Sequence, residues 1–221
     1  MGSVMQKLSA VIFDFDYTLG DSSEGVVHCV NEALGKLDLP EADPEEIKKT
    51  IGFTLEETFI KLNGEDQRVL AKDFVSEFVK EADRVMLGMT RVYSTTHETI
   101  EALRTIGYSL GVVSTKYGYR IRDILRRESI LNSFDVIVGG DSVLNQKPDP
   151  EGLLSAVESL QIKPENAIYV GDSIVDARTA ESAGVPFVAV TTGTTPSEDF
   201  QSFRPFAVID SLSDLPALLI R

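Results

Sequence analysis

Two carboxylates directly follow a short apolar run in the segment Val11–Leu19, and this feature constrains the fold more than any other in the chain. Such a run is typical of a strand that is buried in a parallel sheet. A carboxylate buried inside a sheet without a partner is strongly unfavourable. We therefore expect Asp14 and Asp16 at the end of the strand, in a crevice where a cation offsets their charge. Magnesium, a hard ion that prefers oxygen ligands, is the cation that this chemistry favours.

Strand-like and helical segments alternate through the second half of the chain. Helical stretches separate a series of further apolar runs, which lie at residues 110–113, 136–138, 167–170, 187–190 and 207–209. This alternation predicts an α/β fold, a Rossmann-like parallel sheet with helices on both of its faces. We expect the first strand, Val11–Phe15, to join the same sheet.

Residues 21–88 have a different pattern, with apolar residues at helical spacing and no strand signal between them. Capping patterns at Asp43–Glu46 and Thr54–Glu57 indicate separate helices. We therefore predict a core made of residues 1–20 and 89–221, with an all-helical cap of residues 21–88 inserted into it. The insertion leaves just beyond the first strand, so it can cover the carboxyl ends of the strands, where α/β proteins bind ligands.

Composition excludes several classes of partner. A net charge of −14 over 221 residues argues against nucleic acid binding, which needs clustered Lys and Arg. The nearest basic cluster, Arg120 to Arg127, is predicted to be the solvated side of a helix. No apolar run reaches the roughly 18 residues of a membrane span, and the amino terminus lacks a secretory pattern, so we predict a cytoplasmic protein without membrane contact. The single Cys29 is predicted to be a small core residue.

The segment Asp14-Phe15-Asp16-Tyr17-Thr18-Leu19 resembles the first motif of the haloacid dehalogenase-like superfamily, which consists mainly of magnesium-dependent phosphatases. The resemblance implies that Asp14 attacks phosphorus and becomes an aspartyl-phosphate, and that Asp16 acts as the general acid and base. Taken alone, the motif also fits an acidic, helix-capping turn. Many family phosphatases carry Gly at the position of Tyr17, where we expect an ordinary backbone φ angle.

Two further segments are similar to the second and third motifs of the family. Ser114-Thr115 ends an apolar run, and the resemblance implies that the Ser114 hydroxyl and the Thr115 amide bind the transferring phosphoryl group. Many relatives have Asn in place of Thr115. Lys147, in Gln146-Lys147-Pro148-Asp149-Pro150, is implied to offset charge on the nucleophile and the phosphoryl oxygens. The alternatives are a helix cap for Ser114 and a surface residue in a proline-rich turn for Lys147.

The fourth motif is suggested by Gly171-Asp172-Ser173-Ile174-Val175-Asp176. The resemblance implies that Asp172 binds Mg²⁺ together with the Asp14 carboxylate and the Asp16 backbone carbonyl, while Asp176 acts nearby through water or through orienting hydrogen bonds. An acidic helix start is the alternative for this segment alone. Four motifs in the expected order, each at a strand end, argue against coincidence.

The four motifs together predict a Mg²⁺-dependent phosphatase that hydrolyses a small phosphomonoester, either phosphoglycolate-like or a sugar phosphate. The resemblance covers the helical cap, which the subgroup containing phosphoglycolate phosphatases, β-phosphoglucomutases and pyrophosphatases shares. A phosphomutase, a pyrophosphatase and a non-catalytic binding protein with this fold stay open as alternatives. Substrate contacts are expected around Ile51–Thr54, with Glu56 and Lys116 as further candidates. The sequence leaves the choice between monomer and homodimer open.

Overall fold

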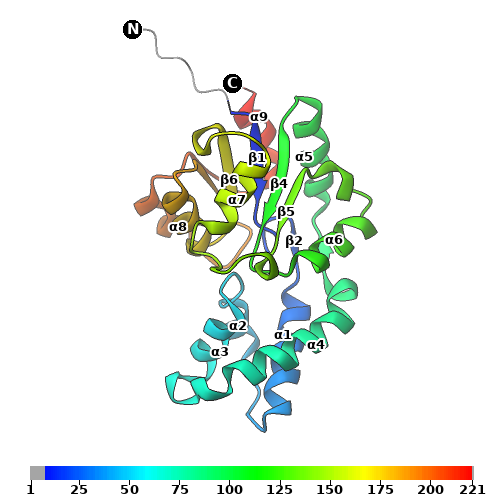
Figure 1. Ribbon diagram of the computed structural model, residues 1–221, viewed down its shortest axis with the longest axis vertical. Helices are drawn as coiled ribbons and strands as arrows, with labels where there is room; N and C mark the ends of the chain where they lie inside the picture. Colours follow the sequence, from blue (N-terminus) through cyan, green and yellow to red (C-terminus); the bar gives the residue numbers. More distant parts are fainter. Residues whose placement is uncertain (1–7, 221) are drawn as a thin grey trace.

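A six-stranded parallel sheet forms the centre of the protein, whose computed structural model describes residues 8–220 (Figure 1). Its strand order is β5-β4-β1-β6-β7-β8, and every neighbouring pair runs parallel. The predicted α/β fold with a parallel Rossmann-like sheet is confirmed. Residues 1–7, which include the amino terminus that is predicted to lack a secretory pattern, lie outside the described residues. The strands are β1 (Ala10–Phe13), β4 (Ser109–Val113), β5 (Val136–Val138), β6 (Ala167–Gly171), β7 (Phe187–Val190) and β8 (Ala207–Ile209).

Strand β1 lies in the middle of the sheet, at the point where the strand order reverses. After β1 the chain adds β4 and β5 on one side of it, and then crosses to the other side to add β6, β7 and β8. Ligands bind at such a switch point in open α/β sheets, in the crevice beyond the carboxyl ends of the strands. The residues that follow β1 therefore reach the most favourable position for a binding site.

Helices cover both faces of the sheet because alternate strand residues point to opposite sides. Val11 and Phe13 belong to a cluster with residues of α5, α6 and α9, whereas Ile12 packs with residues of α7 and α8. The β1 residues are fully buried on both faces, which explains their continuous apolar run. These helices are α5 (Ser94–Thr105), α6 (Gly118–Arg127), α7 (Glu151–Ser159), α8 (Ile174–Ala183) and α9 (Leu215–Leu219).

Four helices lie together beyond one end of the sheet and have an apolar cluster of their own (Figure 1). Phe59 and Phe74 meet in it with ring centroids 5.0 Å apart. Cys29 is fully buried there, as predicted, and burial raises the pKa of its thiol to about 12. Within residues 8–220, no helix combines the length and the apolar character that crossing a membrane requires. The four helices are α1 (Ser23–Lys36), α2 (Pro44–Lys48), α3 (Leu55–Asn63) and α4 (Ala71–Met89).

A short antiparallel pair, β2 (Gly20–Asp21) with β3 (Arg91–Val92), joins the start and the end of this helical block. The prediction that Asp21 begins an all-helical segment is wrong, since Asp21 pairs with Arg91. Two-residue strands are too short to show alternation, so the sequence carries no signal for them. A Cβ atom on Gly20 would lie 2.7 Å from the Arg91 carbonyl oxygen, so this close approach requires glycine.

Candidate active site

The chain turns sharply where β1 ends, and the turn presents Asp14 to the crevice. The Asp14 amide donates to the Val170 carbonyl at 2.8 Å, which ties Asp14 to β6. The Tyr17 amide donates to the Gly20 carbonyl at 2.7 Å, and the Thr192 hydroxyl donates to the Tyr17 carbonyl. The φ angle of Tyr17 is +60°, so the expectation of an ordinary φ is wrong. The turn demands the left-handed conformation here, and Tyr17 adopts it although glycine would do so without strain.

Lys147 connects two of the predicted acids at the bottom of the crevice. Its Nζ atom lies 2.7 Å from Asp14 Oδ1 and 2.6 Å from Asp176 Oδ1. It also donates to the Tyr169 hydroxyl at 3.1 Å, and that hydroxyl lies 3.0 Å from Asp176 Oδ1. Lys147, Asp14 and Asp176 each expose 4% or less of their surface. Because buried charges persist only when they are paired, these contacts fix the nucleophile candidate and its neighbours as one unit.

Burial and mutual repulsion raise the pKa values of Asp14 and Asp172. Burial raises the pKa of Asp14 to about 6, although the attraction of Lys147 opposes the shift. Burial likewise raises the pKa of Asp172 well above its usual value, and the charges of Asp176 and Asp14 add to the effect. Burial alone lowers the pKa of Lys147, but the attraction of Asp14 and Asp176 outweighs it and holds the pKa well above 10.5. The attraction of Lys147 therefore relieves only part of the burial and repulsion that act on these acids.

Asp14, Asp172 and Asp176 each offer a carboxylate oxygen, and these oxygens lie within 4.8 Å of one another. All three residues are buried, and Asp172 accepts a hydrogen bond from Thr18 Oγ1 at 3.3 Å. Buried carboxylate oxygens that lie close together and repel one another are a donor set that suits a hard divalent cation. The residues therefore fit the predicted metal ion. Asp176 also receives hydrogen bonds from the Ser173 amide and hydroxyl, which orient its carboxylate.

Gly193, which no sequence motif marks, lies against the Asp172 carboxylate. A Cβ atom on Gly193 would lie 1.9 Å from Asp172 Oδ2, a separation that no side chain can occupy. The loop after β7 therefore approaches the acid more closely than any residue other than glycine permits. A glycine in a Thr-rich loop gives no sequence signal of this proximity.

The side chain of Asp16, the second aspartate of the first motif, lies apart from this cluster of three acids and contacts Lys116 instead. Asp16 Oδ2 lies 3.1 Å from the ammonium of Lys116, and its other oxygen, Oδ1, is buried without a hydrogen-bond partner among residues 8–220. The Asp16 side chain thus has one oxygen held by a cation and the other unengaged. Asp16 also lines the large cavity described below, whereas Asp14 lies deeper.

The predicted phosphate-binding residues follow β4, the strand next to β1. Ser114 is 5% exposed, and its Oγ atom accepts from the Lys116 amide at 3.3 Å. Because Phe13 and Val112 are paired across the two strands, Ser114 and Asp14 leave the same edge of the sheet. Thr115 contributes to the wall of the cavity.

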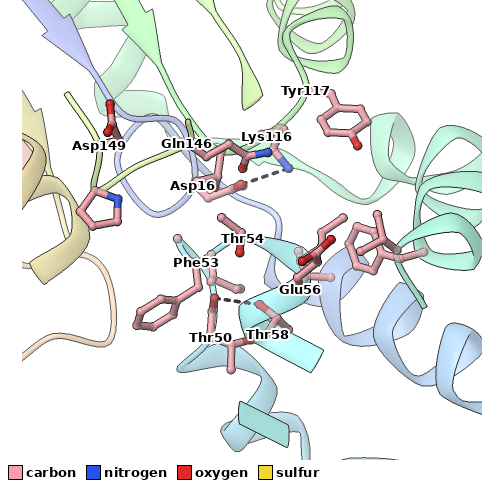
Figure 2. A pocket seen from close by; sticks show the side chains of 18 of the residues that line it. Asp16, Thr50, Phe53, Thr54, Glu56, Thr58, Lys116, Tyr117, Gln146 and Asp149 are labelled. Atoms are coloured by element: carbon pink, nitrogen blue, oxygen red, sulfur yellow. Dashed lines mark hydrogen bonds and ion pairs between the residues drawn. The ribbon is translucent and has the colours of Figure 1, made fainter. Parts of the chain in front are cut away.

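A cavity of about 870 Å³ lies between the sheet and the helical block. Figure 2 shows Asp16 and Lys116 on the core side, with Thr54 and Glu56 facing them from the helical block. The loop 51–54, expected to contact substrate, lines this cavity. The Thr54–Glu57 capping box is present as predicted and begins α3. The volume lies within the range of roughly 300–1,000 Å³ that is usual for small-molecule sites.

The prediction of a solvated basic face on α6 is wrong for Arg120. Arg120 is 8% exposed and lines the cavity. Its Nε atom donates to Asp83 Oδ1 at 2.7 Å, and its Nη2 atom donates to the Val79 carbonyl at 3.0 Å, both on α4. The helical block buries this face of α6, and a sequence pattern does not reveal which neighbour covers a helix.

Known proteins resemble the chain over nearly its whole length. A family model described as haloacid dehalogenase-like hydrolase matches residues 11–190. A phosphoglycolate phosphatase from Salmonella choleraesuis is 34% identical over 97% of this chain and 94% of its own length. A pyrophosphatase from Bacillus mycoides is 30% identical over 97% of this chain and 98% of its own length.

Solved structures agree with these matches. A Bacteroides fragilis protein named as a haloacid dehalogenase-like hydrolase superposes with a TM-score of 0.91 at 42% identity, covering 95% of this chain and 100% of that one. The chain therefore belongs to the haloacid dehalogenase-like hydrolase family, and the resemblance drawn from the four motifs is confirmed. The prediction of an enzyme of this class is confirmed with it.

Proposed function

We propose that the protein is a Mg²⁺-dependent phosphatase that hydrolyses a small phosphomonoester through an aspartyl-phosphate on Asp14. The observation that carries the proposal is the buried contact of Lys147 with Asp14 at 2.7 Å, beside the Asp172 carboxylate and below a ligand-sized cavity. The names of the relatives, a phosphoglycolate phosphatase and a pyrophosphatase, support phosphorus chemistry.

In the first half-reaction Asp14 attacks phosphorus in line with the departing oxygen. Lys147 and the Ser114 hydroxyl stabilise negative charge on the phosphoryl oxygens. Asp16 then donates a proton to the leaving oxygen. Asp14, Asp172 and the Asp16 backbone carbonyl would hold Mg²⁺, which when bound supplies positive charge against the nucleophile and the phosphoryl group.

In the second half-reaction the same Asp16 carboxylate takes a proton from water, which attacks the aspartyl-phosphate and restores Asp14. Asp176 does not react in this scheme. It keeps Lys147 in place through the 2.6 Å contact, and its own position depends on Ser173. A network of this kind preorganises the charges, so the site does not have to rearrange during the reaction.

The helical block supplies the other wall of the site. We propose that residues 21–88 act as a cap on a core formed by residues 1–20 and 89–221, as the sequence predicts. The block begins and ends at the β2–β3 pair, and its loop 51–54 lines the cavity opposite Asp16. A cap in this position excludes water during the first transfer and opens to release product.

Phosphate release from p-nitrophenyl phosphate tests the function, measured with Mg²⁺ and with excess EDTA. We expect Mg²⁺-dependent turnover that Asp14→Asn lowers at least about 10⁴-fold, because the variant lacks the attacking oxyanion. Asp66→Asn, which alters an exposed acid of the helical block, serves as the control and should keep full activity. Full activity of Asp14→Asn would contradict the assignment.

A panel of natural esters then separates the related activities. Phosphoglycolate, sugar monophosphates and pyrophosphate are compared under the same conditions. A phosphatase releases phosphate from a sugar monophosphate without any bisphosphate activator, whereas a phosphomutase needs the activator and returns an isomer. Turnover of pyrophosphate alone would favour the activity that the Bacillus mycoides relative is named for.

A further inference from the structure

Lys116 is a buried cation at the edge of the cavity that the proposed reaction leaves without a task. Its side chain is 5% exposed, and its ammonium lies 3.1 Å from Asp16 Oδ2. Figure 2 shows the two groups facing each other at the core side of the cavity. An ammonium has three donors, and a buried one requires acceptors for them. Asp16 supplies one side-chain acceptor, and the ammonium borders the cavity.

The ammonium of Lys147, the other buried lysine at the site, has more protein partners than that of Lys116. The Lys147 ammonium contacts two carboxylates and a tyrosine hydroxyl, all within 3.1 Å. Among residues 8–220, Lys116 has one carboxylate partner, at 3.1 Å, and that partner is the proposed acid of the reaction. The difference indicates that Lys116, which has fewer partners within the protein than Lys147, has donors left for a ligand.

The other cationic side chain described in the cavity wall, that of Arg120, already has hydrogen-bond partners within the protein. Arg120 lies in α6, just beyond Lys116 in the sequence, and binds Asp83 and the Val79 carbonyl through two of its nitrogen atoms. Its guanidinium is also placed over the rings of Tyr117 and Tyr119, at 5.0 and 5.2 Å from their centroids. Of the two cationic side chains that line the cavity in the described part of the chain, Lys116 is thus the one available to an anionic ligand.

The position of Asp16 fixes which part of a substrate reaches Lys116. If Asp16 protonates the leaving oxygen, that oxygen lies against the Asp16 carboxylate, and the group attached to it lies beside the Lys116 ammonium. An anionic group in this place otherwise meets Asp16 and Glu56 in a chain of net charge −14, so it needs a cation.

We propose that Lys116 is a specificity-determining residue that binds an anionic group on the leaving group, next to the ester oxygen. The preferred substrates are then phosphate derivatives of small acids, in which the leaving group bears a carboxylate or a second phosphate. This inference rests on the phosphatase function and narrows its substrate class. A neutral leaving group gains nothing from Lys116, whose ammonium stays with Asp16.

The test compares 2-phosphoglycolate with the amide of its carboxyl group. The amide keeps the phosphate group but lacks the carboxylate charge. Steady-state kcat and KM are measured with Mg²⁺ for the wild type and for Lys116→Met, Lys116→Arg and the exposed control Lys72→Met. We expect the wild type to prefer the acid. Lys116→Met should lower the ratio of kcat/KM for acid over amide about 10- to 100-fold, the contribution of one charge-assisted hydrogen bond. Most of this loss should appear in KM, and Lys116→Arg should recover part of the preference.

Three results would overturn the proposal. Equal losses on both esters in Lys116→Met would mean that Lys116 acts only through Asp16. An unchanged ratio would mean that it binds no leaving-group charge, and a wild type without preference would mean the same. Failure of the wild type to hydrolyse either ester or p-nitrophenyl phosphate contradicts the phosphatase function itself, and this outcome is distinct from an unchanged ratio in an active enzyme.

Discussion

Charged residues are paired in different ways in the sheet-based core and in the helical block. In the core, Lys147 pairs with Asp14 and Asp176, partners that are 133 and 29 residues away in the sequence, and all three are buried. In the helical block, the ion pairs are mostly between residues three apart on exposed helix surfaces, as in Lys49–Glu46 and Arg68–Glu65. Exposed pairs of this kind contribute little to stability, whereas breaking a buried pair is strongly destabilising. The buried charges of the core therefore depend on contacts between distant segments, whereas the exposed pairs of the helical block depend on neighbouring residues.

Replacing Lys147 should have the largest effect in this comparison. Lys147→Met leaves Asp14 and Asp176 buried without their cation, so we expect a loss of stability of about 3 kcal/mol. Without charge stabilisation of the phosphoryl oxygens, kcat should also fall at least about 100-fold. Denaturant unfolding and p-nitrophenyl phosphate turnover measure the two effects, and the exposed Lys163→Met provides the control.

Thermal unfolding of Lys147→Met with and without Mg²⁺ tests whether the ion binds the same acids as Lys147. If a bound metal ion offsets the same carboxylates as Lys147, the midpoint of thermal unfolding should rise more on adding Mg²⁺ to Lys147→Met than to the wild type. An equal rise in both proteins would show that the ion does not share these acids with Lys147. That result would move the metal site away from Asp14.

A smaller change at Gly193 should weaken metal binding without removing any charge. In Gly193→Ala the new Cβ atom would lie 1.9 Å from Asp172 Oδ2, so the carboxylate must move. We expect Mg²⁺ affinity, measured by calorimetry in the absence of substrate, to fall about 10- to 100-fold, as for other groups that orient metal ligands. Gly88→Ala is the matched control, since no atom lies within 4 Å of its new Cβ. Unchanged affinity in Gly193→Ala would mean that Asp172 is not a ligand.

Much of the core was predictable because each part of it depends on local sequence. The six strands were recognised as apolar runs, and Asp14 and Asp172 follow strand ends, where a parallel sheet brings distant segments to one edge. The position of Asp14 therefore followed from pattern and topology, whereas the places of Lys147 and Asp172 in the site were implied by the resemblance to the third and fourth family motifs. Their roles in catalysis stay predictions.

The missed features all depend on neighbours that are distant in sequence. The φ angle of Tyr17 follows from the turn that returns to Gly20, and the burial of Arg120 follows from the position of α4. The contact of Gly193 with Asp172 likewise requires the packing of two loops. Composition and periodicity describe a residue's own segment, so they carry no information about which other segment lies against it.

The smallest effect is expected in the helical block, far from the buried charges. Asp43 begins α2, and its carboxylate accepts from the amides of Glu45 and Glu46 at 2.9 and 3.2 Å. Asp43→Ala leaves these amides to water, so we expect a loss of about 1 kcal/mol and a fall of about 3 °C in Tm. Asp43→Ser restores the cap and should restore Tm. Because Asp43 belongs to an exposed local structure, kcat should stay within about twofold of the wild-type value in both variants. A larger change in kcat would mean that the block transmits its local stability to the acids of the core, and the two regions could no longer be treated as independent.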